Sequence, residues 1–268
     1  MKDQVYPREA LRERLAALGV PRETHASRVL AGMLPVRSNG ALPGGFDPDA
    51  LAESLIYLLE REVVRAPCRL DALIDPEWGA HRCLFYRSSE DLLEFLAPFF
   101  RQGLLHDEYC LWLSADLEIV AALETVLAGV LDGRRAMEFG LPDAWYLDGA
   151  DAFRAGATLV ANCKWKAQQA REAGYRGLRC AADIGQFNRR LWRGFAEYEC
   201  IVDSALQGLN IKAVCAYPLL EYEPRKLGEL RGCHQEAFAK GDAWWHRITA
   251  TDAGEAAAVL MALQGGRQ

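Results

Sequence analysis

From residue 81 onward, short apolar runs alternate with longer stretches of helical periodicity, and this alternation most constrains the fold. Strands are expected at 82–86, 109–115, either 136–140 or 144–149, 177–185 and 211–220. Each run is apolar along its length, which is typical of strands buried on both faces. The pattern therefore predicts an α/β fold with a mostly parallel sheet sandwiched by helices. Ligands usually bind such sheets beyond the carboxyl ends of the strands.

Helices are expected between these strands and after the last one. They should cover 88–103, a stretch ending near 131, and then 150–173, 189–207 and 225–239. A Trp-rich segment at 244–249 is expected to add an edge strand.

Charge and cysteine content indicate the class of protein. No run of 18 residues is free of charge, so no membrane span is expected. The charged N-terminus lacks an apolar signal core, which favours a cytoplasmic location and no membrane partner. The eight cysteines include no C-x-x-C pair and do not suggest a disulfide framework, and we interpret most of them as core residues.

The N-terminal region has a different organisation. Residues 1–45 carry seven Lys and Arg against four Asp and Glu, whereas residues 67–268 carry 22 against 28. Two short helices, a Gly/Pro-rich loop and a third helix are expected before residue 65. This order is the layout of a winged helix-turn-helix, whose second helix enters the DNA major groove.

Specific residues strengthen this interpretation, because the segment resembles the MerR and excisionase-like families. The matching positions are Leu18-Gly19-Val20, Thr24, Gly32, Leu34-Pro35 and Phe46-Asp47. The resemblance implies an operator DNA partner and a homodimer. It implies phosphate contacts by Arg22, Arg28 and Arg37, and base contacts by Thr24, His25 and Ser27. Arg28 replaces the Trp usual in the recognition helix, and the wing has a single arginine.

The body lacks the common enzyme motifs. Its first strand and helix resemble the start of a RecA-like ATPase, but no G-x-x-x-x-G-K-[ST] occurs. The corresponding loop, 86–91, contains two acids that would repel phosphate. H-E-x-x-H, G-x-S-x-G and G-x-G-x-x-G are also absent. We therefore expect no enzyme activity and no cofactor.

Two blocks of residues make the body similar to the MEDS domain, the sensory domain of DcmR-type regulators in methanogens and methylotrophs. The first block contains His81, Tyr86, Pro98-Phe99, Gly103-Leu104 and Glu108. The second contains Glu199, Asp203, Cys215, Tyr217 and His234. Asp107 stands where the family often has Gly, and Asp183 stands where it usually has Glu. The resemblance implies sensing of a simple hydrocarbon derivative, such as a halogenated or methylated one-carbon compound.

The ligand-binding residues that this resemblance implies are His81, Tyr86, Asp183, Glu199, Asp203, Cys215, Tyr217 and His234. Aromatic walls could come from Phe187, Trp192 and Phe195. Structural roles remain open: His81 could satisfy a buried backbone group, Tyr86 could be core, and Glu199 with Asp203 could form a solvated helix face. No metal is expected in the main interpretation. The alternative is a zinc site of Cys180, Cys215, Cys233 and His234, although their spacing matches no compact site.

Together these features predict a ligand-responsive transcription regulator. The expected domains are a winged helix-turn-helix at 1–65, a linker at 66–80, a MEDS-like domain at 81–250 and a C-terminal helix or tail at 251–268. One alternative is a sensor that acts through protein contacts, which the zero net charge of residues 1–66 favours (nine cations, nine anions). Another is a regulator that senses a metal through Cys and His.

Overall fold

The structure is a computed structural model that describes residues 64–68, 73–131, 136–149, 152–183, 191–241 and 245–264. The expected DNA-contacting residues lie outside these ranges: Arg22, Thr24, His25, Ser27, Arg28 and Arg37. Phe187 also lies outside them. The chain divides into two compact units. Among the described residues, the larger unit contains those between 69 and 221 and from Leu230 to Ala237, and the smaller unit contains 64–68, Tyr222–Glu229 and those from Phe238 onward.

Five parallel strands form the sheet of the larger unit. In sheet order they are β2 (His81–Tyr86), β6 (Ile211–Pro218), β5 (Leu178–Asp183), β3 (Tyr109–Leu113) and β4 (Met137–Gly140). Every residue of β6, which pairs with β2 and β5, is buried, and this explains why its sequence is mostly apolar without alternation. The α/β fold with a mostly parallel sheet is therefore confirmed.

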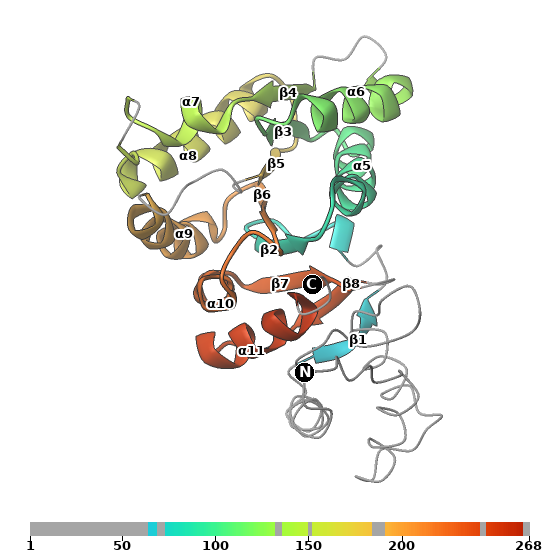
Figure 1. Cartoon of the computed structure of the whole chain (residues 1–268). Coiled ribbons are helices and arrows are strands. Elements are labelled where there is room, and N and C mark those ends of the chain that lie inside the picture. Colours follow the sequence, from blue (N-terminus) through green and yellow to red (C-terminus); the bar gives the residue numbers. More distant parts are fainter. Residues whose placement is uncertain are drawn as a thin grey trace, which may run out of the picture. The chain divides into compact units, whose positions relative to one another are not determined.

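Helices cover both faces of this sheet (Figure 1). They are α5 (Ser89–Leu105) and α6 (Leu117–Leu131) on one face, and α8 (Gly156–Glu172) and α9 (Trp192–Leu206) on the other. The sequence signal at the start of α5 is confirmed, since the Ser88 hydroxyl accepts a hydrogen bond from the amide of Asp91. The segment 144–149 is not the third strand, because α7 (Pro142–Tyr146) begins at a proline just before it.

Strand alternation separates the polar side chains of the sheet into two sets. In parallel strands, residues in register point to the same face and neighbours along a strand point to opposite faces. His81 and Cys215 face α9, where both contact Glu199. Arg179 faces α5 and donates to the carbonyl of Phe99. We call these sides the α9 face and the α5 face.

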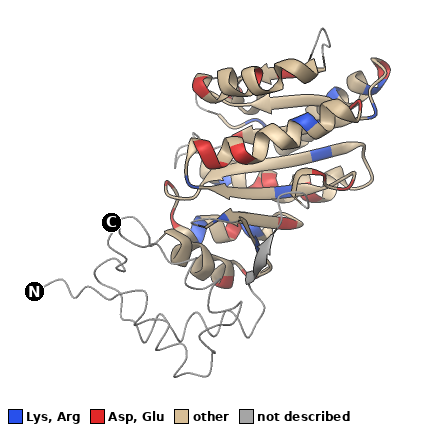
Figure 2. Cartoon of the chain, turned by 90° about the vertical axis from the view of Figure 1, so that its right-hand side faces the viewer, with Lys and Arg blue, Asp and Glu red and all other residues tan. Residues whose placement is uncertain are grey.

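A buried ion network stabilises the α5 face. Glu108 accepts hydrogen bonds from Arg179 and Lys212, and both cations also contact Asp75. Lys and Arg positions accordingly occur within strands of the sheet as well as on helices (Figure 2). Gly103 on α5 makes room for the network, because a Cβ there would lie 2.6 Å from Arg179 Cδ. Gly103 and Glu108, two residues of the family pattern, therefore contribute to the fold.

The smaller unit contains antiparallel strands. β1 (Val64–Cys68) pairs with β8 (Trp245–Ile248), and β7 (Glu236–Lys240) follows β8 in sheet order. The helices α10 (Pro224–Gly232) and α11 (Ala253–Gln264) complete the described elements. None of the helices in the described ranges is long and apolar enough to cross a membrane.

Two expectations for this region are wrong. The helix predicted at 225–239 ends at Gly232, and 236–240 form β7 because a turn after the glycine redirects the chain. The Trp-rich strand is not an edge strand, since β1 pairs with β8. The expected linker at 66–80 begins inside β1, and residue 250 lies in the smaller unit, beyond the end of the larger unit at Ala237. The domain boundaries stay predictions.

Candidate functional site

Four buried side chains converge on the α9 face of the larger unit. They are His81 at the start of β2, Glu199 on α9, Cys215 on β6 and His234 in the turn after α10. Each offers one nitrogen, oxygen or sulfur atom, and these atoms all lie within 4.8 Å of one another. We call these four side chains the donor group. Residues 153 positions apart along the chain thus meet in one place.

The donor group combines hydrogen bonds of the Cys215 thiol with close contacts between Glu199 and the histidines that lack hydrogen-bond geometry. Glu199 Oε2 lies 3.3 Å from His81 Nε2 and 3.2 Å from His234 Nε2. Neither Glu199 Oε2 nor His234 Nε2 has a partner with hydrogen-bond geometry among the described residues. Cys215 Sγ lies 3.4 Å from His81 Nε2 and 3.8 Å from Glu199 Oε1. The group is therefore compact, with several polar atoms left without a well-formed bond.

The outer nitrogen of each histidine faces its own partner. His234 Nδ1 lies 2.7 Å from the carbonyl oxygen of Leu230. A carbonyl only accepts, so Nδ1 carries a hydrogen in this contact, and Nε2 faces the donor group. His81 Nδ1 lies 3.6 Å from Asp203 Oδ1, one turn along α9 from Glu199. Arg231 donates to the carbonyl of His234 and fixes the turn that carries it.

The pKa values of the two histidines shift in opposite directions. Burial raises the pKa of Glu199, but its contacts with His234 and His81 outweigh this and bring it to about 2. Burial lowers the pKa of His81, yet Asp203 and Glu199 raise it by more. The pKa of His234 is lowered by burial and by the charge of His81. The surroundings therefore favour the charged form of His81 and the neutral form of His234.

A small cavity of about 40 Å³ borders the donor group between the sheet, α8 and α9. His81 and Cys215 line it together with apolar side chains. The other lining side chains include Leu111, Leu113, Tyr146, Cys163, Cys180, Ala182, Tyr198 and Val202. Pockets for drug-sized ligands measure roughly 300–1,000 Å³, and one water occupies roughly 30 Å³ of liquid. The cavity therefore suits a molecule of only a few heavy atoms.

The structure brings together most of the residues predicted for ligand binding. His81, Glu199, Cys215 and His234 form the donor group, and Asp203 supports His81. Tyr217 lies nearby, its ring centroid 6.2 Å from that of His234. Glu199 is fully buried, so it does not belong to a solvated helix face.

Two of the predicted residues lie apart from the donor group. The Tyr86 hydroxyl donates to Asp183 Oδ1 at 3.0 Å, and this pair joins the carboxyl ends of β2 and β5. Asp183 is in register with Ala216, whereas Cys215 is in register with Ala182. Asp183 and Cys215 therefore point to opposite faces of the sheet.

The alternative zinc set is not assembled as the sequence suggested. Cys233 is disulfide-bonded to Cys200, and Cys180 lines the cavity without joining the donor group. His81 and Glu199 stand beside Cys215 and His234 instead. Among the cavity residues, Tyr146 and Tyr198 were missed. The only signal for them was the aromatic content of 145–146 and 195–198.

The aromatic residues predicted to form pocket walls pack against one another and do not line an open pocket. Trp192 and Phe195 have ring centroids 5.9 Å apart, and Phe195 meets Tyr217 edge-on at 6.1 Å. Tyr217 in turn meets the ring of His234 edge-on at 6.2 Å. This packing accounts for the burial of Phe195 and Tyr217.

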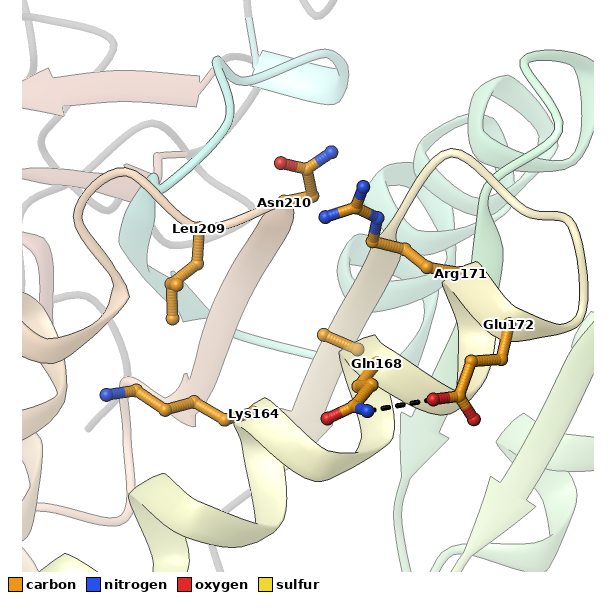
Figure 3. A pocket seen from close by; sticks show the side chains of 7 residues that line it. Lys164, Gln168, Arg171, Glu172, Leu209 and Asn210 are labelled. Carbon is orange, nitrogen blue, oxygen red and sulfur yellow. Dashed lines mark hydrogen bonds between the residues drawn. The ribbon is translucent and has the colours of Figure 1, made fainter.

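A second pocket, of about 550 Å³, lies along α8 and the loop before β6 (Figure 3). It is lined by Lys164, Ala167, Gln168, Arg171, Glu172, Leu209 and Asn210. Gln168 donates to Glu172 across one helical turn, as the dashed line in Figure 3 shows. None of the predicted site residues lines this pocket, and its polar groups are those of an exposed helix surface.

A parallel α/β unit with buried polar groups beside a small apolar cavity has the features of a small-molecule binding domain. The family model of the MEthanogen/methylotroph, DcmR Sensory domain (MEDS) matches residues 80–235, more than half of the chain. The chain belongs to this family, so the predicted sensory domain is confirmed. No curated protein matches the chain. The N-terminal helix-turn-helix stays a prediction.

Proposed function

We propose that this protein is a ligand-responsive transcription regulator. Its sensory domain binds a small hydrocarbon derivative and thereby controls DNA binding by the N-terminal helix-turn-helix. The observation that carries the proposal is the cavity of about 40 Å³, which His81 and Cys215 border inside a sensory domain. No catalytic step is part of the proposal.

The size and lining of the cavity favour a one-carbon effector. A halogenated or methylated one-carbon compound has few heavy atoms and little polarity, which matches a small site lined mainly by Leu, Ala, Cys and aromatic side chains. Its one polar or polarisable atom would face His81 and Cys215. Binding would shift the protein between two states only if the effector prefers one of them.

The basic N-terminal segment supports DNA as the partner. Residues 1–45 carry an excess of three positive charges, and the body carries an excess of six negative charges. A basic module on an acidic body suits DNA contact through one end of the chain. We propose that Arg22, Arg28 and Arg37 contact phosphates and that a homodimer reads a two-fold symmetric operator.

Mobility-shift assays with the full-length protein and the DNA upstream of its own gene test this function. Binding should weaken steeply with salt, and methanol or dichloromethane should change it. Ala182→Val fills part of the cavity and should abolish the effector response without removing DNA binding. Ala161→Val, on the exposed side of α8, is the matched control. No DNA binding at low salt, with or without these compounds, contradicts the proposal.

A second candidate is a sensor that signals through a protein partner. The zero net charge of residues 1–66 and the presence of Arg28 in place of Trp favour it. Purification of the full-length protein from its native cells distinguishes the two. A stoichiometric protein partner together with absent DNA affinity supports this second candidate.

A further inference from the structure

We propose that His81, Glu199, Cys215 and His234 bind one zinc ion. The sequence alone favoured no metal, and its alternative set contained only two of these four residues. The proposal concerns the donor group itself and does not depend on DNA binding or on the identity of the effector.

Three distances within the donor group are close to the edges of a zinc coordination tetrahedron: those from Glu199 Oε2 to each histidine Nε2, and that from Cys215 Sγ to His81 Nε2. Zinc–nitrogen and zinc–oxygen bonds of about 2.0–2.1 Å place neighbouring donors about 3.3 Å apart, and a zinc–sulfur bond of about 2.3 Å extends the edge to about 3.6 Å. The histidine nitrogens lie 3.3 and 3.2 Å from Glu199 Oε2. Cys215 Sγ lies 3.4 Å from His81 Nε2 and 3.8 Å from Glu199 Oε1. Hydrogen bonds between nitrogen and oxygen are most often about 2.9–3.0 Å long.

The partners outside the group have the roles expected around a metal. Histidines that bind zinc usually donate their other ring N–H to a carboxylate or a backbone carbonyl. His81 Nδ1 faces the carboxylate of Asp203, and His234 Nδ1 donates to the carbonyl of Leu230. Both Nε2 atoms are thereby turned toward Glu199. Asp203 is a positioning residue in this arrangement.

The charges in the site also favour a divalent cation. Glu199 is fully buried, and a buried carboxylate is costly unless positive charge balances it. When zinc binds, the Cys215 thiol releases a proton to solvent, and both histidines coordinate as neutral imidazoles. One thiolate and one carboxylate then balance the two positive charges of the zinc ion, so the ion and its four ligands together are neutral. Two imidazoles, one thiolate and one carboxylate are donors that zinc accepts together.

A second cluster of possible metal ligands differs from the donor group because Lys and Arg side chains already pair with its carboxylates. Asp75, His106 and Glu108 also lie within reach of one ion. There, however, Lys212 and Arg179 already contact both carboxylates. No protein cation makes such a contact to Glu199 among the described ion pairs apart from the two histidines.

The position of the ion would connect it to sensing. His81 and Cys215 belong both to the donor group and to the wall of the cavity. A small molecule in the cavity would therefore lie beside two zinc ligands. This link to sensing rests on the proposed function, whereas zinc binding itself does not.

Metal titration of the full-length protein tests the site. The protein is stripped with a chelator, checked for folding by circular dichroism and titrated with zinc or cobalt alone. We expect one ion per chain and, with cobalt, the near-ultraviolet charge-transfer absorption of a cobalt–thiolate bond. His234→Ala should lower affinity more than 100-fold, and Asp203→Asn about 10- to 100-fold.

Cysteine variants make the test independent of misfolding. Cys215→His keeps a metal ligand, so it should retain one ion per chain but lose the charge-transfer band. Cys180→Ala, which removes a thiol from the same cavity wall, should keep both the ion and the band. Folded wild-type protein that binds no stoichiometric zinc or cobalt overturns the proposal. A charge-transfer band that survives in Cys215→His, or is lost in Cys180→Ala, overturns it equally.

Discussion

Glu108 and Arg179 form an ion pair inside the larger unit, with their side chains 1% and 0% exposed. Lys212 contacts the other oxygen of the same carboxylate. Two cations thus share one fully buried anion, and Asp75 supplies the remaining negative charge from a half-exposed position. The α5 face of the sheet therefore contains buried charges, although the strand sequences are mainly apolar.

Replacing Glu108 with Gln should destabilise the protein strongly. Removing one partner of a buried ion pair costs about 3–5 kcal/mol, because the remaining charge stays buried. Urea unfolding at neutral pH measures the change. Glu197→Gln is the matched control, since its ion pair with Arg193 is exposed and should contribute about 1 kcal/mol or less. Equal losses for the two variants would contradict the buried network.

Gly103 should be intolerant of alanine although it lies in a helix. Gly→Ala in a helix normally stabilises by about 0.5–1 kcal/mol. At Gly103 the new Cβ would lie 2.6 Å from Arg179 Cδ and 3.0 Å from Cys110 Sγ. We expect a loss of about 1–3 kcal/mol, which is the usual cost of overpacking.

The comparison for this substitution is Gly129 on α6. A Cβ at Gly129 meets nothing within 4 Å, so Gly129→Ala should stabilise the protein. Thermal unfolding of both variants measures the two signs. Stabilisation by Gly103→Ala would show that Arg179 moves aside without cost.

Glu138 should make stability depend on pH in the acid range. It accepts hydrogen bonds from Tyr109 at 2.8 Å and from Lys166. Burial raises the pKa of Glu138, but these bonds outweigh it and hold the pKa below 4.5. The folded state therefore binds the proton less tightly than the unfolded state, and the stabilisation is lost as pH falls through the folded pKa.

Urea unfolding at a series of pH values measures this effect. Wild type should be more stable than Glu138→Gln near neutral pH, and the difference should shrink on acidification below the ordinary pKa of 4.5. Lys166→Gln should reduce the same pH dependence. A difference between wild type and Glu138→Gln that is constant with pH would contradict the assignment.

The strands were predicted well because a strand that is buried on both faces has a continuous apolar run in its sequence. β2, β3, β5 and β6 each begin within about two residues of the apolar run that identified them. β7 was missed because its buried residues, Ala237–Ala239, also continue the helical pattern of α10. Tertiary pairing, rather than local preference, decides such a short segment.

The site was predictable in its residues but not in its geometry. His81, Glu199, Cys215 and His234 came from the resemblance, which carries no distances. The separation of Asp183 from Cys215 depends on the register of β5 and β6, and a shift of one residue would reverse it. Register is set by long-range packing, so one sequence alone does not reveal it.

The disulfide between Cys200 and Cys233 should stabilise the folded protein. Their disulfide joins α9 to the turn after α10, and the neighbouring residues are Glu199 and His234. Closing a loop of 33 residues stabilises the folded state by about 3–4 kcal/mol through the unfolded chain. Cys200→Ser/Cys233→Ser should therefore lose about that much free energy of unfolding in urea.

Reductant should lower the stability of wild type to that of the double variant and leave the double variant unchanged. Cys163 is a free buried thiol, so Cys163→Ser should respond to reductant as wild type does. Because the bond also holds the segments that carry Glu199 and His234, the double variant should bind zinc more weakly. Equal stability of wild type with and without reductant would show that this bond does not constrain the fold.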